Sequence, residues 1–234
     1  MELSKGNSQM DTWNTTMFLY KSALKEIGTR IDILNDEFLN IHKYNPIEHV
    51  KSRIKTPDSI VKKLKRDGYD VNIENMLKHV NDIAGIRIIC SFTSDIYRIA
   101  DMITGQSDIN VITVKDYIKE PKENGYKSYH MIVSIPIFLS DKVVDVKVEI
   151  QIRTIAMDFW ASLEHKIYYK FEGQAPDDII DALKECSALV SILDERMLLL
   201  NNRIKDYKNN EIVEKDTLMS TMNELIEGEI KKQR

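Results

Sequence analysis

The densest charge in the sequence lies between residues 51 and 66. Seven of these residues are basic and one, Asp58, is acidic, which leaves +6 in a chain whose net charge is −4. An acidic net charge does not suit a general nucleic-acid coat, which carries basic charge over a whole face. The local positive charge therefore indicates either a solvated helix face or a site for a small anion.

Helix signals arrange these basic residues in space. Thr56 before Pro57 predicts an N-cap and a first helical position, and Asp67-Gly68 predicts the helix end. Cations that converge on one spot from two elements suit a polyphosphate. Because the sequence has no G-x-x-x-x-G-K-[ST] loop, side-chain charge would have to hold such a ligand. Five residues could do so: Arg53 and Lys55 before the helix, and Ser59, Lys63 and Arg66 on one face of it.

A second group of polar residues lies on an alternating stretch, DVKVEIQIR at 145–153. Alternation of period two predicts a β-strand with one face in a core and the other face polar. Glu149 and Gln151 lie on the polar face. A carboxylate on a rigid strand can hold Mg²⁺ or accept a proton, whereas the alternative is the solvated face of an antiparallel sheet.

Asp82 and Arg87 lie in a third stretch, NDIAGIRIIC at 81–90. Asp82 precedes a predicted strand and Arg87 lies on it. The two could form a buried salt bridge, or they could supply a second carboxylate for Mg²⁺ and a further cation for phosphates. Their spacing does not distinguish these alternatives.

The fourth group surrounds a predicted turn in PKENGYKSYH at 121–130. Tyr126 follows Gly125, and Lys122 and His130 lie on either side. An aromatic ring among cations can stack on a base while the cations bind its phosphates. The alternative is a charged hairpin tip with a packed tyrosine.

Periodic segments predict the elements that must hold these groups. Apolar residues spaced by three and four from Trp13 to Ile41 predict a helix that packs on its own domain or on another subunit. Residues 177–208 contain no Gly or Pro and carry an apolar stripe, which predicts a long helix. Shorter helices and β-rich runs lie between them, so we expect an α+β or mixed α/β fold. The β-rich runs are residues 86–92, 111–118, 129–135 and 143–152.

This pattern divides the chain into an N-terminal helical segment (1–45), a central domain (46–170) and a C-terminal helical segment (171–234). With 234 residues, of which 43% are hydrophobic, the chain can bury one core with helical appendages. Cys90 and Cys186 are far apart, and we expect both to be buried and reduced, which favours the cytoplasm. Neither a signal peptide nor an apolar run long enough to span a membrane is evident.

Taken together, the four groups resemble the small alarmone synthetases, the single-domain members of the RelA/SpoT-type (p)ppGpp synthetase family. The resemblance covers residues 45–170. It rests on four ordered motifs: R-x-K-x-x-x-S-x-x-x-K-x-x-R from Arg53, D-I-A-G-I-R from Asp82, K-x-x-G-Y-[KR]-S-Y-H from Lys122 and V-E-I-Q-I-R-T from Val148. The run DFWASLEHKIYYK at 158–170 is also typical of the family.

The resemblance implies a fold and a reaction. The fold is an α+β nucleotidyltransferase-like domain with a mixed, mainly antiparallel sheet of about five strands and flanking helices. The enzyme is a GTP diphosphokinase without hydrolase activity, which moves the β,γ-diphosphate of ATP to the ribose 3′-OH of GTP or GDP. Its products are AMP and pppGpp or ppGpp. Mg²⁺ is the implied cofactor and a homotetramer the implied assembly.

The same resemblance implies a role for each candidate residue. Asp82 and Glu149 match the carboxylates that hold Mg²⁺, and Glu149 also matches the base for the 3′-OH. The ATP-binding positions, of which the first and last contact adenine, are Arg53, Lys55, Ser59, Lys63, Arg66 and Arg87. The GTP- or GDP-binding positions, among which the tyrosine stacks on guanine, are Lys115, Lys122, Tyr126, His130 and Gln151.

Two residues depart from the family pattern. Lys115 stands where many members have Arg, so it keeps the charge and loses the planar fork. Asp158 stands where some members have Asn beside a regulatory pppGpp site. We therefore expect Asp158 to repel a phosphate there, with weak or no activation by pppGpp.

Two other functions are alternatives to diphosphate transfer. A nucleotidyltransferase that acts on RNA is disfavoured, because its Gly-Ser and D-x-D signature is absent. The alternative from another class is an RNA-binding or regulatory protein with a weak or inactive site. The resemblance leaves single-stranded RNA open as a partner.

Overall fold

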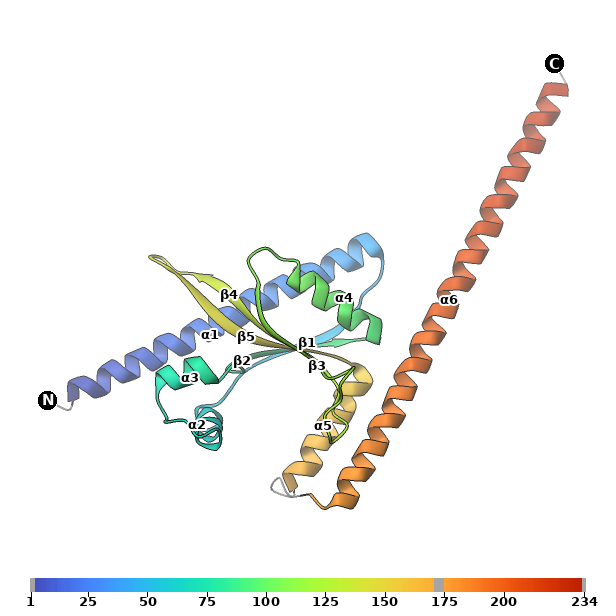
Figure 1. Cartoon of the computed structure of the whole chain (residues 1–234). Helices are drawn as coiled ribbons and strands as arrows, with labels where there is room; N and C mark the ends of the chain where they lie inside the picture. Colours follow the sequence, from blue (N-terminus) through green and yellow to red (C-terminus); the bar gives the residue numbers. More distant parts are fainter. Residues whose placement is uncertain (1–2, 171–174, 233–234) are drawn as a thin grey trace.

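The chain folds around one five-stranded sheet in a computed structural model, which describes residues 3–170 and 175–232 (Figure 1). The expected α+β fold is confirmed. The elements are α1 (Leu3–Glu37), a π-helical turn η1 (Phe38–His42), β1 (Ile47–Ile54), α2 (Pro57–Arg66), α3 (Ile73–His79), β2 (Ala84–Cys90), α4 (Thr93–Thr104), β3 (Asn110–Asp116), β4 (Tyr129–Phe138), β5 (Val143–Thr154), α5 (Ile155–Lys170) and α6 (Asp177–Lys232).

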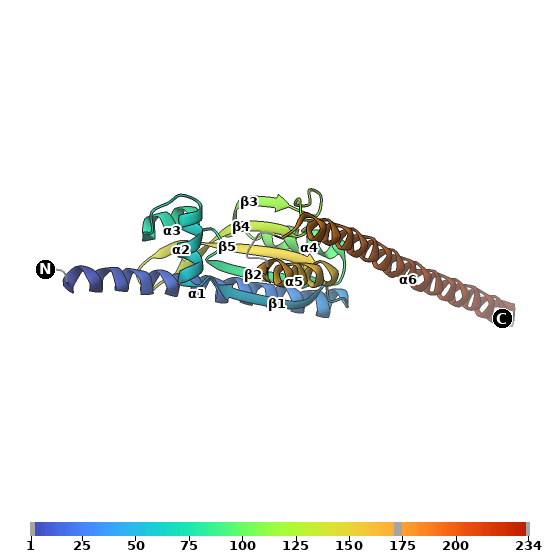
Figure 2. The same cartoon turned by 90° about the horizontal axis from the view of Figure 1, so that it is seen from below.

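The sheet has the strand order β1-β2-β5-β4-β3, which puts β5 at its centre. β5 pairs in parallel with β2 and antiparallel with β4, and the edge strands β1 and β3 are antiparallel to their neighbours. Figure 2 shows the strands in this order, with α2 and α3 toward one end and α5 and α6 toward the other. The predicted mixed, mainly antiparallel sheet is therefore confirmed.

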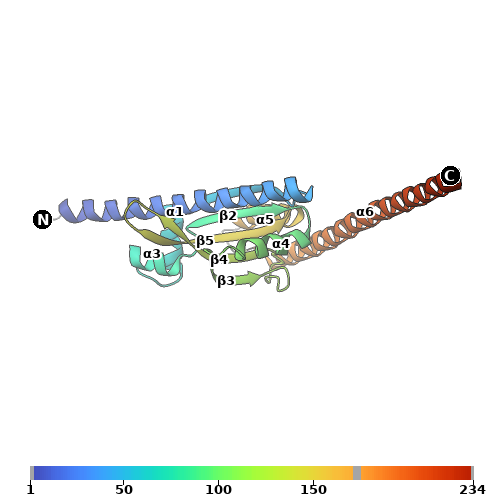
Figure 3. The same cartoon turned by 90° about the horizontal axis from the view of Figure 1, so that it is seen from above.

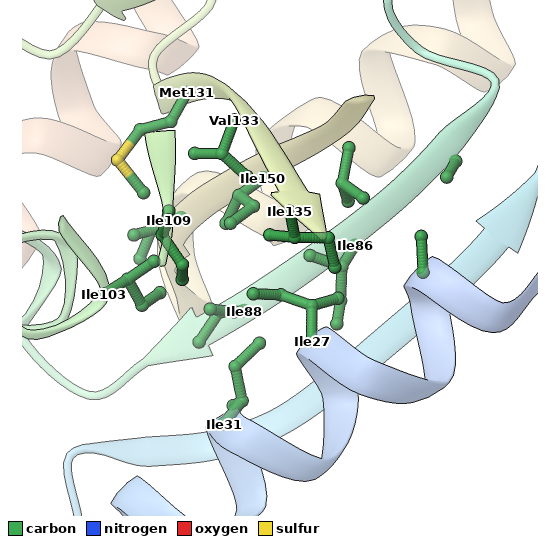
Figure 4. Close-up of a cluster of buried hydrophobic side chains, with 14 of the residues drawn as sticks. Ile27, Ile31, Ile86, Ile88, Ile103, Ile109, Met131, Val133, Ile135 and Ile150 are labelled. Carbon is green, nitrogen blue, oxygen red and sulfur yellow. The ribbon is translucent and has the colours of Figure 1, made fainter. Parts of the chain in front are cut away.

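One face of the sheet is apolar and is covered by α1 and α4 (Figures 1 and 3). The alternation along β5 places Val148, Ile150 and Ile152 on this face, where each is 0% exposed. Ile27 and Ile31 of α1 pack onto the same cluster (Figure 4). The N-terminal helix thus packs on its own domain, the first of the two alternatives that the sequence allows.

α2 begins and ends where the sequence predicts. The Thr56 side chain accepts a hydrogen bond from the Ser59 N–H at 3.3 Å, and the helix starts at Pro57. Gly68 has a φ of 80°, a left-handed conformation that suits glycine just after a helix end. Because Ile60 and Leu64 are buried, the basic residues of α2 lie on its other side.

A second apolar cluster joins α5 to α6. It contains Trp160, Ala161 and Leu183, and the Trp160 Nε1–H donates to the Leu183 carbonyl at 3.0 Å. α6 then runs well beyond the sheet (Figure 1). Neither α6 nor any other helix in the described ranges has the length and apolar character to cross a bilayer. Six apolar side chains along α6, here called the α6 stripe, are exposed: Leu189, Ile192, Leu193, Met197, Leu200 and Ile204.

Two predictions about single residues are wrong. Ile41 is 67% exposed rather than part of an apolar seam, because the π-helical turn that starts at Phe38 changes the angular spacing of the side chains. Cys186 is exposed, whereas Cys90 is buried as expected. On α6 the buried face is centred between Leu183 and Ser187, and Cys186 lies at the margin of this face, so its thiol reaches solvent.

The packing of α1 on the sheet yields a stability prediction. Ile27 is 0% exposed, whereas Ile33 on the same helix is 60% exposed. Replacing Ile27 by Ala should lower the free energy of unfolding by about 2–5 kcal/mol, because a cavity remains in the core. Ile33→Ala is the control and should change it by less than about 0.5 kcal/mol. Urea unfolding followed by circular dichroism measures both, and equal losses would contradict this packing.

Candidate active site

The face of the sheet opposite α1 carries a row of polar residues, one from each strand. Cross-strand pairing aligns Lys51 with Arg87, Arg87 with Gln151, Gln151 with His130, and His130 with Lys115. Alternation within each strand keeps all five side chains on one face. Residues from five separate strands therefore become neighbours across the sheet.

Glu149 lies on the same face of β5, two residues before Gln151 and near the centre of the sheet. It pairs with Gly85 of β2 and, on the other side, with Ile132 of β4. It lines a cavity of ≈ 240 Å³. The cavity is lined by Lys51, Ser52, Arg53, Gly85, Ile86, Arg87, Glu149 and Gln151. The two arginines expected to contact adenine thus share one cavity with the expected base.

A second cavity, of ≈ 300 Å³, lies beside α2. Its lining residues are Lys55, Ser59, Lys62, Lys63, Arg66 and Asp82. All the residues expected to bind the ATP phosphates are therefore brought together with the first expected metal ligand. Lys62 also lines this cavity, although the sequence analysis gave it no role.

Two lysines hold Asp82. The Lys55 Nζ donates to its Oδ2 and the Lys63 Nζ donates to its Oδ1, each at 2.7 Å. Burial works to raise the pKa of Asp82, but the hydrogen bonds and charges of these lysines outweigh it, so the pKa lies below its ordinary value. Within the described residues Asp82 and Arg87 do not form the salt bridge that was one alternative, since Arg87 donates instead to Asp158 at 3.1 Å.

Asp82 and Glu149 are the two carboxylates of the site that could contribute to a magnesium ion, and they line separate cavities. The two carboxylates interact electrostatically, and Mg²⁺ commonly takes one or two protein carboxylates and completes its shell with water and phosphate oxygens. No group of three or more His, Cys, Asp or Glu side chains in the described part of the chain could hold a metal by itself. A magnesium ion here would therefore need substrate phosphates among its ligands.

Two neutral neighbours contact Glu149. The His130 Nδ1 lies 3.5 Å from its Oε1, and the Gln151 Nε2–H donates to its Oε2 at 2.9 Å. Burial alone would raise the pKa of Glu149, but the hydrogen bonds from His130 and Gln151 outweigh it, and the pKa lies below its ordinary value. Burial lowers the pKa of His130 more than Glu149 raises it, so His130 is neutral at pH 7. Glu149 is therefore ionised and held by hydrogen-bond donors.

Tyr126 lies beside these residues. Its hydroxyl is 2.8 Å from the His130 Nε2, and the Lys122 Nζ lies 4.8 Å from the centroid of its ring. Four of the residues expected to bind the acceptor, Lys122, Tyr126, His130 and Gln151, are thus brought together. The fifth, Lys115, is exposed at the end of the polar row, on the edge strand β3.

The loop that carries Tyr126 is docked on α6. The Ser187 Oγ donates to the Gly125 carbonyl at 2.5 Å, and the Lys127 Nζ donates to the Ser191 Oγ at 2.6 Å. Gly125 has a φ of +88°, and a Cβ added there would lie 2.8 Å from the Ser187 Cβ, so a side chain does not fit. The C-terminal helix thus helps to build the site, which the sequence analysis did not predict.

Arg153 and Asp158 belong to the site, although sequence reasoning gave neither a role in it. Arg153 is 4% exposed and its Nη1 donates to the Asp158 Oδ1 at 3.1 Å. Asp158 also accepts from Arg87, so two guanidinium groups compensate its charge. This compensation reduces the repulsion of phosphate expected of Asp158, and weak or absent activation by pppGpp stays a prediction. The alternation along β5 was the signal for Arg153, because it places that residue on the polar face with Glu149.

Residues 52–174 match the family model for the region found in RelA / SpoT proteins. Among curated proteins, the chain is similar to the GTP pyrophosphokinase YwaC of Bacillus subtilis (strain 168). The two are 48% identical over 195 residues, which cover 83% of this chain and 93% of the relative.

Two solved structures are similar along most of their length. The small alarmone synthetase 2 of Bacillus subtilis has a TM-score of 0.74 at 47% identity and covers 82% of this chain and 98% of its own. The small alarmone synthetase 1 of Bacillus subtilis, bound to its product pppGpp, has a TM-score of 0.77 at 34% identity and covers 83% and 98%. The similarity therefore extends over a whole protein and not just over a motif.

The lysine pair around Asp82 yields a pH prediction. Replacing Lys63 by Met removes one of the two cations, so the pKa of Asp82 should rise toward or above its ordinary value of 3.8. Because the pKa is lowered in the folded chain, its contribution to stability is full above the unfolded value and is lost as the pH falls through the folded one. In the variant, that loss should begin at a higher pH. Carboxyl ¹³C NMR titration of Asp82 measures the change.

Lys65→Met is the matched control for this titration. Lys65 lies on the same helix and its side chain is exposed. This variant should leave the Asp82 titration unchanged. Equal shifts in the two variants would show that the charge of the whole helix, rather than the contact with Lys63, lowers the pKa.

Proposed function

The chain belongs to the RelA/SpoT family and, within it, to the small alarmone synthetases, and from this premise we propose what each part of its site does. As a GTP diphosphokinase, it transfers the β,γ-diphosphate of ATP to the ribose 3′-OH of GTP or GDP and releases AMP. It is a synthetase without hydrolase activity. The observation that carries the mechanism is the place of Glu149, which lines the cavity of Arg53 and Arg87 and contacts His130 on its other side.

Electrostatic repulsion is the main obstacle to this reaction. Two nucleotide tails bring about seven or eight negative charges together, and each close pair costs several kcal/mol in a partly exposed site unless cations screen it. Lys55 and Lys63 now bind Asp82, and both can turn to phosphates that enter the second cavity. Asp82 then loses its lysine partners and becomes available as a metal ligand.

The two nucleotides are recognised by different chemistry. Arg53 and Arg87 line their cavity from adjacent strands, an arrangement that suits a flat adenine between two guanidinium planes. On the other side, Tyr126 offers a ring to guanine, and Lys122 offers a cation to the phosphates. Lys115 extends this cationic edge, the neutral His130 lies beside it, and Gln151 lies closest to the reacting carboxylate.

Glu149 accepts the proton of the 3′-OH. The hydroxyl oxygen forms a bond to the β-phosphorus of ATP, and the bond from that phosphorus to the oxygen of the α-phosphate breaks. AMP leaves with that oxygen and its electron pair. The negative charge of the bound polyphosphates makes the Glu149 carboxylate a stronger base than it is in the free chain. Mg²⁺, bound by Asp82 and Glu149 together with the phosphates, would neutralise charge on the transferred group.

The reaction is tested by incubating the protein with Mg²⁺, ATP and GTP and separating the nucleotides. AMP and a guanosine pentaphosphate should appear in equal amounts. Glu149→Gln should lower kcat by about 10²–10⁴-fold with little change in ATP affinity, because an amide cannot accept the proton. Glu74→Gln, on the exposed side of α3, is the control and should keep wild-type turnover.

The outcomes of this assay separate the claims. A wild-type chain that forms no pentaphosphate would refute the reaction itself. A Glu149→Gln variant with normal kcat would leave the reaction in place and remove Glu149 as its base.

The α6 stripe supports self-association. Its side chains are 49–66% exposed, with Met197 and Leu189 at the two extremes. Contiguous exposed apolar surface of this kind marks a protein contact, and an amphipathic helix buries it well against a second copy. We propose that the chain forms a homo-oligomer through this stripe, a tetramer by analogy with the family.

Leu193→Asp should reduce the mass of the assembly, because it places a charge within the stripe. Asn202→Asp adds the same charge nine residues along, about half a turn of helix away from Leu193 when rotations of 100° per residue are summed, and should leave the mass unchanged. Light scattering after gel filtration measures both. A wild-type mass for Leu193→Asp would exclude the stripe as the contact.

The free cysteines bear on the location of the chain, and the basic residues 51–66 bear on RNA binding. Cys90 and Cys186 are both free, which supports a reducing compartment such as the cytoplasm.

Many cations of residues 51–66 line the two cavities, which favours bound nucleotides over single-stranded RNA as their ligand. RNA binding stays an alternative prediction.

A further inference from the structure

Arg153 lies where the two halves of the site meet, and the reaction above gives it no role. Its Nε donates to the Ser128 Oγ at 3.2 Å, and its Nη1 donates to the Asp158 Oδ1 at 3.1 Å. Its Nη2 donates to the Gln151 Oε1 at 3.2 Å and to the Tyr126 hydroxyl. Arg153 is 4% exposed and Ser128 is 0% exposed, so the protein rather than solvent fixes the guanidinium group.

Arg153 closes a ring of hydrogen bonds around the reacting carboxylate. One arm runs from Arg153 to the Tyr126 hydroxyl, then 2.8 Å to the His130 Nε2. The His130 Nδ1 continues it to the Glu149 Oε1 at 3.5 Å. The other arm runs from Arg153 to the Gln151 Oε1, and the Gln151 Nε2 donates to the Glu149 Oε2 at 2.9 Å.

The direction of each hydrogen bond in the ring follows from Arg153, because a guanidinium group has donors only. Since Arg153 donates to the Tyr126 oxygen, the Tyr126 O–H points to the His130 Nε2. With Nε2 as an acceptor, the neutral imidazole carries its proton on Nδ1, which faces Glu149. On the other arm, Gln151 presents its oxygen to Arg153, so its NH₂ group faces Glu149.

We propose that Arg153 is a positioning residue for diphosphate transfer: it sets the tautomer of His130 and the amide orientation of Gln151, so that both oxygens of Glu149 are held by donors. The inference rests on the proposed function, in which Glu149 accepts the proton of the acceptor hydroxyl. Arg153 acts through its neighbours and does not itself touch the reacting atoms.

Asp158 extends the network to the ATP side. Its Oδ1 accepts from the Arg153 Nη1 and the Arg87 Nη1, each at 3.1 Å. Among the described side chains, the buried Nε of Arg87 has no hydrogen-bond partner, so this carboxylate is the anchor of Arg87. A movement of Arg87 toward adenine would therefore change the contacts of Arg153 through Asp158. A movement of Tyr126 toward guanine would change the contacts of Arg153 directly.

Arg153→Met and Arg153→Lys separate charge from geometry. Lysine keeps a positive charge but lacks the fork that reaches Tyr126 and Gln151 together. Both variants should lower kcat about tenfold to a hundredfold. In ¹⁵N NMR spectra of both variants, the His130 proton should no longer reside on Nδ1 alone, because the Tyr126 oxygen loses its donor from Arg153 and the Tyr126 O–H can turn away from the His130 Nε2. Arg30→Lys removes a guanidinium group paired with Asp108, away from the site, and should keep the wild-type kcat and the wild-type His130 tautomer.

Tyr126→Phe tests the ring without changing a buried arginine. Its phenyl ring can still stack on guanine, but the link from Arg153 to His130 is cut. The KM for GTP should stay within about twofold while kcat falls about tenfold. In ¹⁵N NMR spectra, His130 should carry its proton on Nδ1 in the wild-type chain, and the proton should be shared between both nitrogens in the Tyr126→Phe variant.

A His130 proton that stays on Nδ1 in Arg153→Met and Arg153→Lys would overturn the proposal, and so would a wild-type His130 with its proton on Nε2. If the arginine variants do not fold, Tyr126→Phe and the NMR spectra decide. Absence of pentaphosphate from the wild-type chain would refute the proposed function instead. The tautomer of His130 can be measured in either case, so the two failures are distinguishable.

Discussion

The central position of β5 in the sheet is the constraint on which the site depends. One face of this strand fills the core with Val148, Ile150 and Ile152, so the other face must present Glu149 and Gln151. Because β5 pairs on both sides, arginines of β1 and β2 lie on one side of Glu149 and His130 of β4 lies on the other. An edge strand would have given the carboxylate neighbours on one side only, and just one nucleotide could have reached it.

Three carboxylates of the site are stabilised in two different ways. Lysines bind Asp82 and arginines bind Asp158, so cations compensate both charges directly. Glu149 is contacted instead by the uncharged His130 and by Gln151. Neutral donors orient a carboxylate with less loss of basicity than a bound cation would cause. This difference fits the role of base to Glu149, in addition to its share with Asp82 in holding Mg²⁺, and gives Asp158 a supporting role.

Local sequence rules predicted the parts of the structure that local forces decide. Period-two alternation gave the two faces of β5, and the cap residue Thr56 gave the start of α2. The exposure of Ile41 depends on a π-helical turn, which has no comparable signal in the sequence. The contact of Gly125 with Ser187 joins residues 62 positions apart, and only packing of the finished chain brings them together. The roles of single residues could be predicted only from the family motifs. The spacing of Asp82 and Arg87 in the sequence did not distinguish a salt bridge between them from a role of Asp82 as a metal ligand.

Two nucleotides must meet across Glu149 for the chain to act as described. A crystal structure with a non-hydrolysable ATP analogue and GTP bound together measures this most directly. We predict adenine between Arg53 and Arg87, guanine against Tyr126, and the ribose 3′-oxygen about 3–3.5 Å from the β-phosphorus, within hydrogen-bond reach of Glu149. Nucleotides bound on another surface, or with their phosphates directed away from Glu149, would contradict it.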